Sequence, residues 1–404
     1  MSLSKNSLII PITHFIERYD IGLFVFFSPT IVAECLGGNG NSYPLLSFFL
    51  FSVAYLARPL GAVVFGYIGD KFGRKNCFLL SIYLILLSTA AVCFAPTSLG
   101  VTSIIIIAIA RFFQGLASGT ELISALLLIS ETKKDEKIPS DLVLLRLSAT
   151  AGLLCAGLIF LLFNTAGYAS WRYPFYLGLA LNIFNLLIRH KLTESEEFLE
   201  AKEGMVFESF FSHLKKVLSQ FREIILCLLL SALGPGLFYT TTVYLPEISG
   251  ISSDLLNAKL LIITYWIVAT VMIYFASRTI DSRKIIYVSV SLIASACILQ
   301  LTGLLSIKPT LYMLIAGGSG IFALSYITYK NLFSVEKRQT GLSIGVSLGQ
   351  ATLGGNAPFL ISLIYNIYAA QNAWCIFVLA LCTLFAASLY IVENKVLMPT
   401  RKSI

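Results

Sequence analysis

Charged residues are scarce in this chain: Asp, Glu, Lys and Arg together make up 12% of its 404 residues, whereas hydrophobic residues make up 57%. A soluble protein of this length carries about twice that share of charge. The apolar runs are about 20 residues long and continuous, without the alternation that is typical of strands in an outer-membrane barrel. The sequence therefore predicts an all-α membrane protein whose helices cross the bilayer.

Motifs of several other protein classes are also missing. The sequence has no Gly-x-x-x-x-Gly-Lys-Ser/Thr motif, which argues against ATP-driven transport, and no His/Asp/Ser set on a soluble domain, so we predict that it is not an enzyme. Its eight cysteines are scattered, mostly within apolar runs, without a Cys-x-x-Cys motif or a Cys/His cluster. We therefore predict packing cysteines, no metal site and no cofactor.

A window of about 20 residues finds about twelve apolar segments. The predicted spans are 9–34, 44–68, 77–95, 101–129, 141–164, 173–189, 224–246, 257–277, 285–305, 310–329, 342–367 and 373–392. We expect the first span to be retained, because it lacks a cleavage site and carries Glu17, Arg18 and Asp20. We also expect the fourth span to be shorter than its apolar run.

The positions of the 29 Lys and Arg residues predict the topology. Most of them lie in the termini and in the loops after even-numbered spans, and Arg189 at the end of the sixth span is counted among them. This asymmetry predicts that both termini are cytoplasmic. It also accounts for the net charge of +8, so we predict a lipid bilayer and no nucleic acid as partner.

The longest polar stretch divides the spans into two groups of six. We expect an amino-terminal bundle at 1–190, a cytoplasmic linker at 191–222 and a carboxyl-terminal bundle at 223–404. Apolar residues recur in the linker at helical spacing: Phe207, Phe210, Phe211, Leu214, Val217, Leu218 and Phe221. The opposite face carries Glu208, His213, Lys215 and Lys216, which predicts an amphipathic helix on the inner membrane face. Both a plain connector and a regulatory binding helix fit this pattern.

The loop between the second and third spans is short, basic and rich in glycine: Gly66-Tyr-Ile-Gly69-Asp70-Lys71-Phe72-Gly73-Arg74-Lys75. Its glycines let the helix ends approach closely, and its cations favour an anionic cytoplasmic surface. Asp70 can cap a helix N-terminus or pair with an arginine. A fainter copy, Ser277 to Lys284, stands at the corresponding place in the second half. The repetition predicts two six-helix repeats with a substrate cavity between them.

This loop resembles the signature of the major facilitator superfamily, and further stretches look like motifs of its metabolite:proton symporter family. They are Glu17-Arg18-Tyr19-Asp20, Ala57-Arg58-Pro59-Leu60-Gly61, Arg111 to Glu121, Trp171 to Phe175, Glu194 to Phe198 and Thr340 to Pro358. The resemblance covers residues from about 12 to about 390. It implies twelve helices in two pseudo-symmetric bundles, and proton-coupled import of a small organic solute such as a carboxylate, proline or a betaine by alternating access. It also implies a multi-pass protein of the bacterial inner membrane.

The sequence departs from the family pattern at three positions that bear on coupling. His14 stands where asparagine is usual, Arg18 stands where tryptophan is usual, and Thr120 replaces a glycine. The resemblance implies that the loop residues Gly66, Asp70, Lys71, Gly73, Arg74 and Lys75 take part in gating.

Ionisable groups inside a bilayer are costly, so each is a functional candidate. In the first half these are Glu17, Arg18, Asp20, Arg111 and Glu121. Arg111 and Glu121 are about 15 Å apart along one helix, so we expect each to meet a charge of the first span. Arg111 with Glu17 or Asp20 would form a protonation switch; a static ion pair is the alternative. Arg18 could instead neutralise Glu17 and leave Asp20 or Glu121 as the titrating group. His14 could join a relay or be simply hydrogen-bonded.

The second half has no acidic residue in the middle of a span and offers neutral groups instead. The cavity candidates there are Tyr239, Tyr265, Gln300, Tyr326, Gln350 and Asn356. Aromatic residues could cage a quaternary ammonium, and Arg111 could take a carboxylate, although packing and interfacial positions also suit these residues. A larger ferric polycarboxylate and a non-transporting membrane sensor or scaffold are the alternative functions. Since one chain holds both repeats, we expect a monomer.

Overall fold

The computed structural model describes residues 5–38, 44–131, 138–166, 170–202, 208–245, 255–368 and 372–397, which form helices and short connections with no strand among them. The chain divides into two compact units. Unit 1 comprises Met1–Leu214 and Val335–Ile344, and unit 2 comprises Lys215–Ser334 and Gly345–Ile404. Two helices, α8 (Phe210–Leu218) and α15 (Val335–Gly349), contribute residues to both units.

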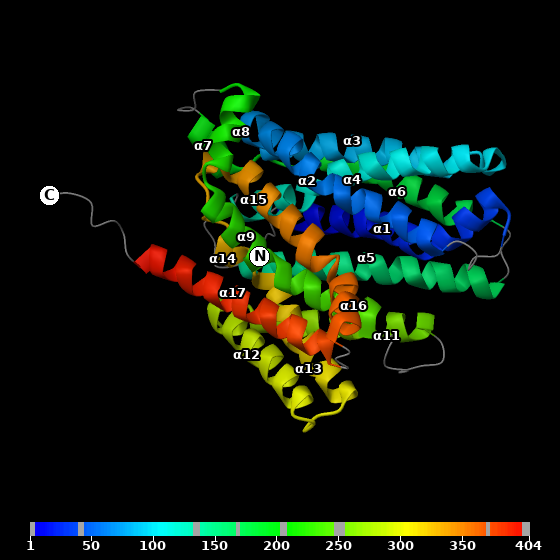
Figure 1. Cartoon of the computed structure of the whole chain (residues 1–404). Coiled ribbons are helices and arrows are strands. Elements are labelled where there is room, and N and C mark those ends of the chain that lie inside the picture. Colours follow the sequence, from blue (N-terminus) through cyan, green and yellow to red (C-terminus); the bar gives the residue numbers. More distant parts are fainter. Residues whose placement is uncertain are drawn as a thin grey trace. The chain divides into compact units, whose positions relative to one another are not determined.

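The long helices among the described residues of unit 1 lie side by side (Figure 1). Its elements are α1 (Lys5–Leu36), α2 (Pro44–Phe72), α3 (Arg74–Cys93), the 3-10 helix η1 (Thr97–Leu99), α4 (Val101–Ser130), α5 (Ile138–Ala166), α6 (Arg172–Arg189) and the short α7 (Glu196–Lys202). α1 packs along α5, α2 packs along α4, and α3 packs against α4 and α6.

Small residues let α2 and α4 approach closely. A Cβ at Gly115 would lie 2.1 Å from the carbonyl oxygen of Ala54, and a Cβ at Gly119 would lie 2.2 Å from that of Arg58. Helices in a bilayer associate through such backbone contacts, because lipid supplies no hydrophobic force between them. The two glycines therefore set the distance between α2 and α4, and with it the position of Arg111 on α4.

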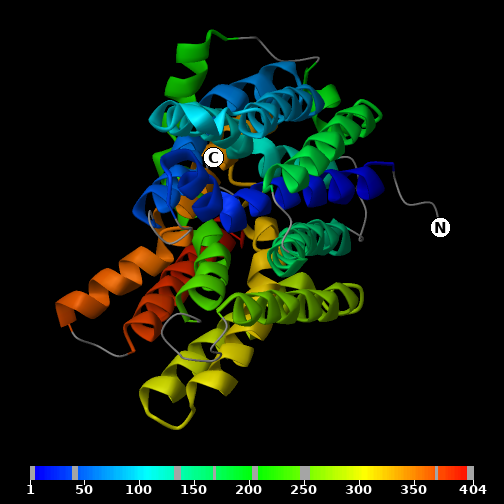
Figure 2. The ribbon, with the colours of Figure 1, turned by 90° about the vertical axis from the view of Figure 1, so that its right-hand side faces the viewer.

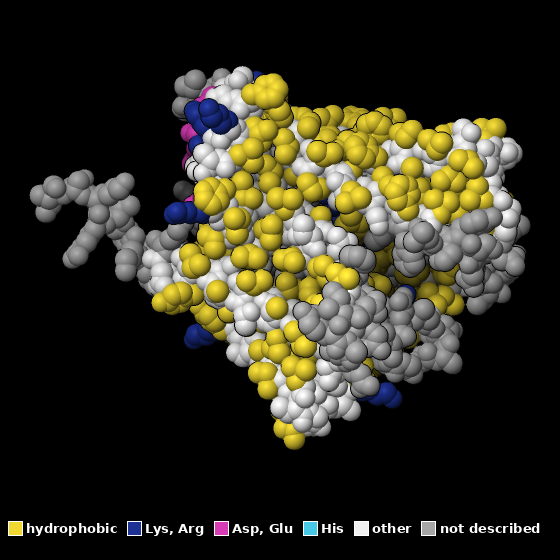
Figure 3. Space-filling view, viewed as in Figure 1, with side chains coloured by type: hydrophobic (Ala, Val, Ile, Leu, Met, Phe, Trp, Pro, Cys, Tyr) yellow, Lys and Arg dark blue, Asp and Glu magenta, His cyan; other side chains and the backbone are white. Residues whose placement is uncertain are grey.

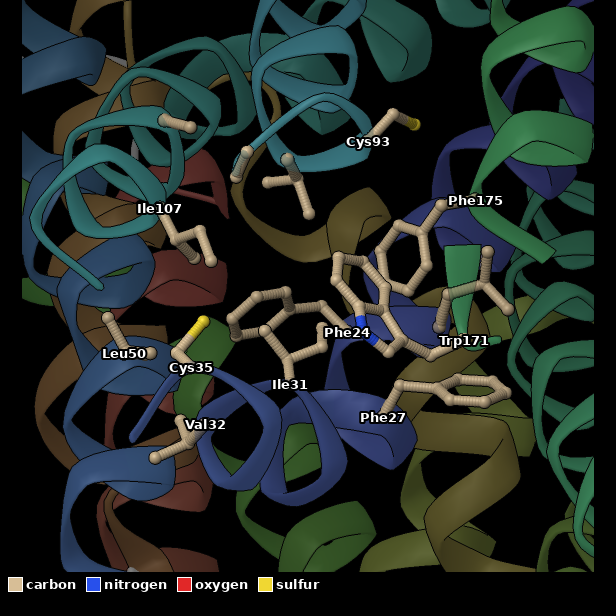
Figure 4. Packing of buried hydrophobic residues seen from close by; sticks show 14 of the residues in the cluster. Phe24, Phe27, Ile31, Val32, Cys35, Leu50, Cys93, Ile107, Trp171 and Phe175 are labelled. Carbon is tan, nitrogen blue, oxygen red and sulfur yellow. The ribbon is translucent and has the colours of Figure 1, made fainter. Parts of the chain in front are cut away.

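An aromatic cluster joins α1 to the beginning of α6 (Figure 4). Phe175 packs edge to face against Phe27 and Trp171, with ring centroids 6.1 and 5.4 Å apart. The Trp171 indole N–H donates to Glu34 of α1 at 2.7 Å, and Arg172 pairs with the same carboxylate at 3.1 Å. These contacts hold α1 and α6 together about two to four helical turns from Asp20.

The described residues of unit 2 form helices and two π-helical segments. Its elements are α9 (Phe221–Tyr239), η2 (Thr240–Tyr244), α11 (Leu255–Ala276), α12 (Ser282–Leu301), α13 (Ile307–Leu324), α14 (Tyr326–Tyr329), η3 (Gln350–Gly354), α16 (Ala357–Tyr368) and α17 (Ala373–Leu397). α12 and α13 form a hairpin, yellow in Figures 1 and 2. The π-helical segment η3 packs on α9, where a Cβ at Gly354 would lie 2.9 Å from Pro235.

Ten helices within the described residues are long and apolar enough to cross a membrane, and each overlaps a predicted span. The other two predicted spans, 173–189 and 342–367, coincide with α6 and with the series α15, η3 and α16. α4 extends as one helix over its whole apolar run, and Arg111, Gln114 and Glu121 find partners inside unit 1. A helix can extend beyond the bilayer, so the shorter fourth span stays a prediction.

Apolar side chains dominate the face shown in Figure 3, whereas charged ones gather near α7 and α8. Leu56, Leu60 and Val64 form an exposed stripe along α2 at a spacing of four residues. Exposed apolar stripes on long helices are the surfaces that lipid tails cover in a membrane protein.

Candidate functional site

Asp20 lies on the buried side of α1 and is held by two neutral side chains. Its Oδ2 accepts from the Thr89 hydroxyl of α3 at 2.9 Å and from the Gln114 amide of α4 at 2.5 Å. The Gln114 carbonyl in turn accepts from the guanidinium of Arg111, which stacks on the ring of Phe24 at 4.2 Å. Asp20 and Arg111 are therefore joined through Gln114, and Gln114 is a site residue that the sequence analysis did not select.

A small cavity lies beside this group. Its volume is about 10 Å³, which is about the size of one water molecule. It is lined by Asp20, Phe24, Thr89, Val92, Arg111, Gln114 and Phe175. Two buried atoms of these residues, Oδ1 of Asp20 and Nε of Arg111, have no hydrogen-bond partner among the described residues. Oδ1 of Asp20 can therefore accept a hydrogen bond, and Nε of Arg111 can donate one, when the protonation state changes or a group binds.

Glu17, one helical turn before Asp20 on α1, forms a second buried group. Its Oε2 lies 2.9 Å from Nδ1 of His14 and 3.8 Å from Nε of Arg18. The Ser118 hydroxyl of α4 lies 3.4 Å from its Oε1, and its carboxyl group also interacts with that of Glu121. His14, Glu17 and Asp20 thus follow one another at a spacing of three residues along one side of α1.

Glu121 forms an ion pair with Arg189, and both side chains are fully buried. Arg189 also donates to the Asn185 side chain at 3.0 Å and to the carbonyl oxygen of Phe78 at 2.8 Å. Arg189 was predicted in a cytoplasmic loop, but it comes from α6 and is the ion-pair partner of Glu121. Glu121 also meets a charge of the first span, Glu17, as expected. A signal was present in the sequence, since Asn182, Asn185 and Arg189 share one side of α6.

Asp70, at the end of α2, holds the beginning of α15. Its two carboxylate oxygens accept from the backbone N–H groups of Gln339 and Thr340, each at 2.9 Å, and from the Thr340 hydroxyl at 2.6 Å. Arg74 lies 3.4 Å from the same carboxylate, and His213 of α8 lies 3.3 Å from it. A carboxylate near the start of a helix is stabilised by the helix dipole. Gly66 and Gly69 make room, since a Cβ there would lie 2.7 Å from Thr340 and 2.5 Å from Gln339.

The turn between α2 and α3 is closed by Glu194. Gly73 has φ of +111°, a conformation that favours glycine, and a Cβ there would lie 2.1 Å from the Glu194 carboxylate. That carboxylate accepts from the backbone N–H groups of Arg74 at 3.0 Å and Lys75 at 3.2 Å. Lys71 donates instead to the Tyr67 hydroxyl at 3.0 Å.

Glu131 connects this turn to α15. It pairs with Arg74 at 3.2 Å and with Arg338 at 2.8 Å, and Arg338 also pairs with Glu197. Burial lowers the pKa of Arg338, but the carboxylates of Glu197 and Glu131 outweigh this and raise it. The segment Val335–Ile344 is therefore tied to unit 1 by Asp70 and by Glu131.

The six cavity candidates of the second half lie in separate elements of unit 2. Tyr239 ends α9 immediately before η2, Gln350 begins η3, and Asn356 lies exposed just after η3. Tyr265 packs against Tyr312 with ring centroids 5.2 Å apart, Tyr326 packs against Tyr329, and the Gln300 amide pairs with the Thr310 hydroxyl at 2.8 Å. The two π-helical segments were not predicted. Such segments often mark functional positions in helices, and Pro235 and the glycines before Asn356 were their sequence signal.

A family model described as "Sugar (and other) transporter" matches residues 7–209. A relative from Staphylococcus haemolyticus named for proline/betaine transport is 27% identical over 87% of this chain and 80% of its own length. A citrate-proton symporter from Klebsiella pneumoniae is 23% identical over 96% of this chain and 92% of its own. A proline/betaine transporter from Escherichia coli is 27% identical over 57% of this chain and 50% of its own length.

Solved structures of low sequence identity have the same fold. The proton:xylose symporter XylE superposes with a TM-score of 0.73 at 14% identity, covering 96% of this chain and 95% of XylE. The human organic anion transporter MFSD10 superposes with a TM-score of 0.68 at 14% identity, covering 97% of this chain and 100% of that protein.

Proposed function

Since the chain belongs to the sugar (and other) transporter family of the major facilitator superfamily, we propose that it carries a small organic solute into the cell together with protons, by alternating access. The all-helical major facilitator fold and the family expected from the sequence are confirmed, and the chain is a multi-pass membrane protein and not an enzyme. The observation that carries the proposal is the buried path from Asp20 through Gln114 to Arg111.

Asp20 is the proton-binding group in this proposal. Glu17 lies beside Arg18 and His14, and Glu121 is paired with Arg189, whereas the direct partners of Asp20 are the neutral Thr89 and Gln114. A proton on Asp20 removes a buried charge that lacks a directly bonded cation. The carboxylate oxygen that accepts from Gln114 then becomes a poorer acceptor, and Gln114 can turn away from both Asp20 and Arg111.

Arg111 is the solute-binding cation. Once Gln114 releases it, its guanidinium can bind a carboxylate with two parallel hydrogen bonds. Proton binding and solute binding then favour each other by the same free energy, which is the requirement for symport. The relatives named for proline, betaine and citrate transport all take solutes with a carboxylate, so we propose a carboxylate-bearing solute. In the second half, Tyr239 and Gln350, which lie beside η2 and η3, stay candidate cavity residues.

The location and assembly follow from the same proposal. The relatives are bacterial, so the proposed location is the bacterial inner membrane. The Lys and Arg pattern supports cytoplasmic termini. We further propose two six-helix bundles, at 1–190 and 223–404, that work within a single chain and are connected by a linker at 191–222.

A panel of labelled solutes in proteoliposomes tests the proposed function. With the outside made acidic, we expect L-proline, glycine betaine or citrate to accumulate inside, and a protonophore to collapse the accumulation. D-Xylose serves as a solute without a carboxylate. Uptake of xylose alone would contradict the assigned solute class, and equilibration without accumulation of any solute would contradict proton coupling.

Replacing Asp70 with Asn tests the proposed gating role. Asparagine keeps the shape of the side chain but loses the charge that strengthens its bonds to Gln339 and Thr340. Hydrogen bonds to a charged group are worth about 1.5–3 kcal/mol, so we expect transport to slow by roughly tenfold or more. The amount of protein in the membrane should stay the same, as judged by immunoblotting. Transport at the rate of the parent protein would reduce Asp70 to a determinant of topology.

A further inference from the structure

His213 lies on the packed side of α8, not on its polar side. Phe210, His213, Leu214 and Val217 recur at helical spacing on this side, and the His213 side chain is only 12% exposed. Phe211 is 79% exposed on the other side. The prediction that His213 lies on the polar face, opposite the apolar residues, was wrong. Phe207, the first of those apolar residues, lies outside the described part of the chain. A histidine on a packed helix side requires a polar partner.

The partners of His213 are Asp70 and Thr340. Its Nε2 lies 3.1 Å from the Thr340 hydroxyl oxygen and 3.3 Å from Oδ2 of Asp70. Its ring packs at 5.4 Å from the ring of Tyr67, whose hydroxyl donates to the backbone carbonyl of Glu208 at 3.0 Å. These contacts place the first turn of α8 directly against the carboxylate that holds α15.

The direction of the hydrogen bonds shows what a second proton on the ring would do. The Thr340 hydroxyl donates to Asp70, so its oxygen accepts from the Nε2–H of His213. The neutral ring already makes this bond. A proton added at Nδ1 makes the ring a cation beside the Asp70 carboxylate, and histidine is the side chain that changes charge between about pH 5 and 8.

Other charged groups lie near His213 and Asp70. Arg74 on α3 shares the Asp70 carboxylate and opposes a second cation, although its other contact, with Glu131, offsets part of its charge. The Glu208 carboxylate accepts from Ser212 of α8. The Lys71 ammonium donates to the hydroxyl of Tyr67, whose ring packs against His213. Asp70 is the charge in direct contact with the ring.

We propose that His213 is a regulatory proton-binding site on the cytoplasmic side, whose protonation tightens the hold of Asp70 on Gln339 and Thr340. The hold is therefore stronger in acid and weaker as the pH rises through the range in which the ring loses its proton. α15 continues from Ile344 in unit 1 to Gly345 in unit 2, so the state of this contact is passed along one helix. The consequence for transport rests on the proposed function: a symporter that brings in protons would slow as the cytoplasm acidifies.

Hydrogen–deuterium exchange of the full-length protein in lipid nanodiscs tests the site without any solute. Exchange is compared at about pH 6 and about pH 8, after correction for the intrinsic pH dependence of amide exchange. In the parent protein, the peptide containing Gln339 and Thr340 should exchange roughly fivefold more slowly at the lower pH, the effect of about 1 kcal/mol for a partly exposed ion pair.

Two variants and a matched control complete the experiment. His213→Gln should exchange at one corrected rate at both pH values, and His213→Lys, with a lasting charge, should keep the slow rate at both. His190, which is exposed and lies 3.2 Å from the Tyr83 hydroxyl, supplies the control, and His190→Gln should behave like the parent protein. Equal protection at both pH values in the parent protein, or a pH effect that survives in His213→Gln, would overturn the proposal. Because no solute is used, these outcomes are independent of whether transport is proton-coupled.

Discussion

Solute accumulation driven by a pH gradient is expected to be lost when Asp20 is replaced with Asn, while exchange of solute across the membrane continues. Asparagine keeps an oxygen that can accept from Thr89 and Gln114, so the helices stay in place. It cannot bind the coupling proton. With one proton per solute, the parent protein should accumulate solute about tenfold for each unit of pH difference, and the variant should only equilibrate it. Labelled-solute uptake by proteoliposomes, with and without the gradient, measures both quantities.

The other two buried acids are the matched controls for Asp20. Glu17→Gln and Glu121→Gln each remove an acid that already has a basic partner, His14 and Arg18 or Arg189. Both variants should keep accumulation if Asp20 carries the proton. Loss of accumulation in one of them alone would move the coupling site to that residue. If all three amide variants accumulate solute, the buried charges are structural and the proton switch is wrong.

Replacing Arg189 with Met should destabilise the protein by about 3–5 kcal/mol, because it leaves Glu121 as a buried charge without its cation. The double variant, Arg189→Met with Glu121→Gln, should recover most of the lost stability, since no uncompensated charge is left. The free energy of unfolding in mixed micelles, measured by denaturant titration, gives the three values of the cycle. Arg172→Met is the control: its partner Glu34 is partly exposed, and the expected loss is at most about 1 kcal/mol.

One outcome of this double-mutant cycle would contradict an interaction between Arg189 and Glu121. If the effects of the two single substitutions simply add in the double variant, Arg189 and Glu121 do not interact, and the buried pair does not hold α4 to α6. A loss in Arg189→Met no larger than that in Arg172→Met would contradict the burial of the pair in the same way.

The sequence predicted the helices well because a bilayer imposes one requirement on all of them. A span must be apolar and about 20 residues long, and this can be counted along the chain. The same reasoning selected the buried ionisable groups, because a charge in an apolar run needs a partner. It could not supply the partners of Gln114 and Glu121, since these come from other helices.

The contact partners of the buried charged residues were harder to predict than the positions of these residues in the helices. Helical spacing shows that His14, Glu17 and Asp20 share one side of α1, but it does not show which helix that side faces. Gln114 was overlooked because it is neutral, and only ionisable residues were selected by the cost of burying a charge. It nevertheless joins Asp20 to Arg111. Arg189 was overlooked because a cation at the end of a span fits the positive-inside pattern equally well.

In the second half, neutral side chains gave the sequence analysis little to distinguish a binding residue from a packing residue. The structure gives Tyr265 and Gln300 local partners in Tyr312 and Thr310. The π-helical segments beside Tyr239 and Gln350 mark positions where the regular helix is interrupted. All six candidates stay predictions. Tyr239 and Gln350 have the strongest structural reason to be tested first, because they lie beside these segments.

Proton movement caused by the solute itself tests the central claim most directly. Proteoliposomes are prepared with equal pH inside and outside, and the transported solute is added to the weakly buffered outer medium while its pH is recorded. The outer medium should become more alkaline as protons enter with the solute. Asp20→Asn should show labelled solute entering without this change. Solute entry without alkalinisation in the parent protein, or alkalinisation that persists in Asp20→Asn, would contradict proton-coupled import through Asp20.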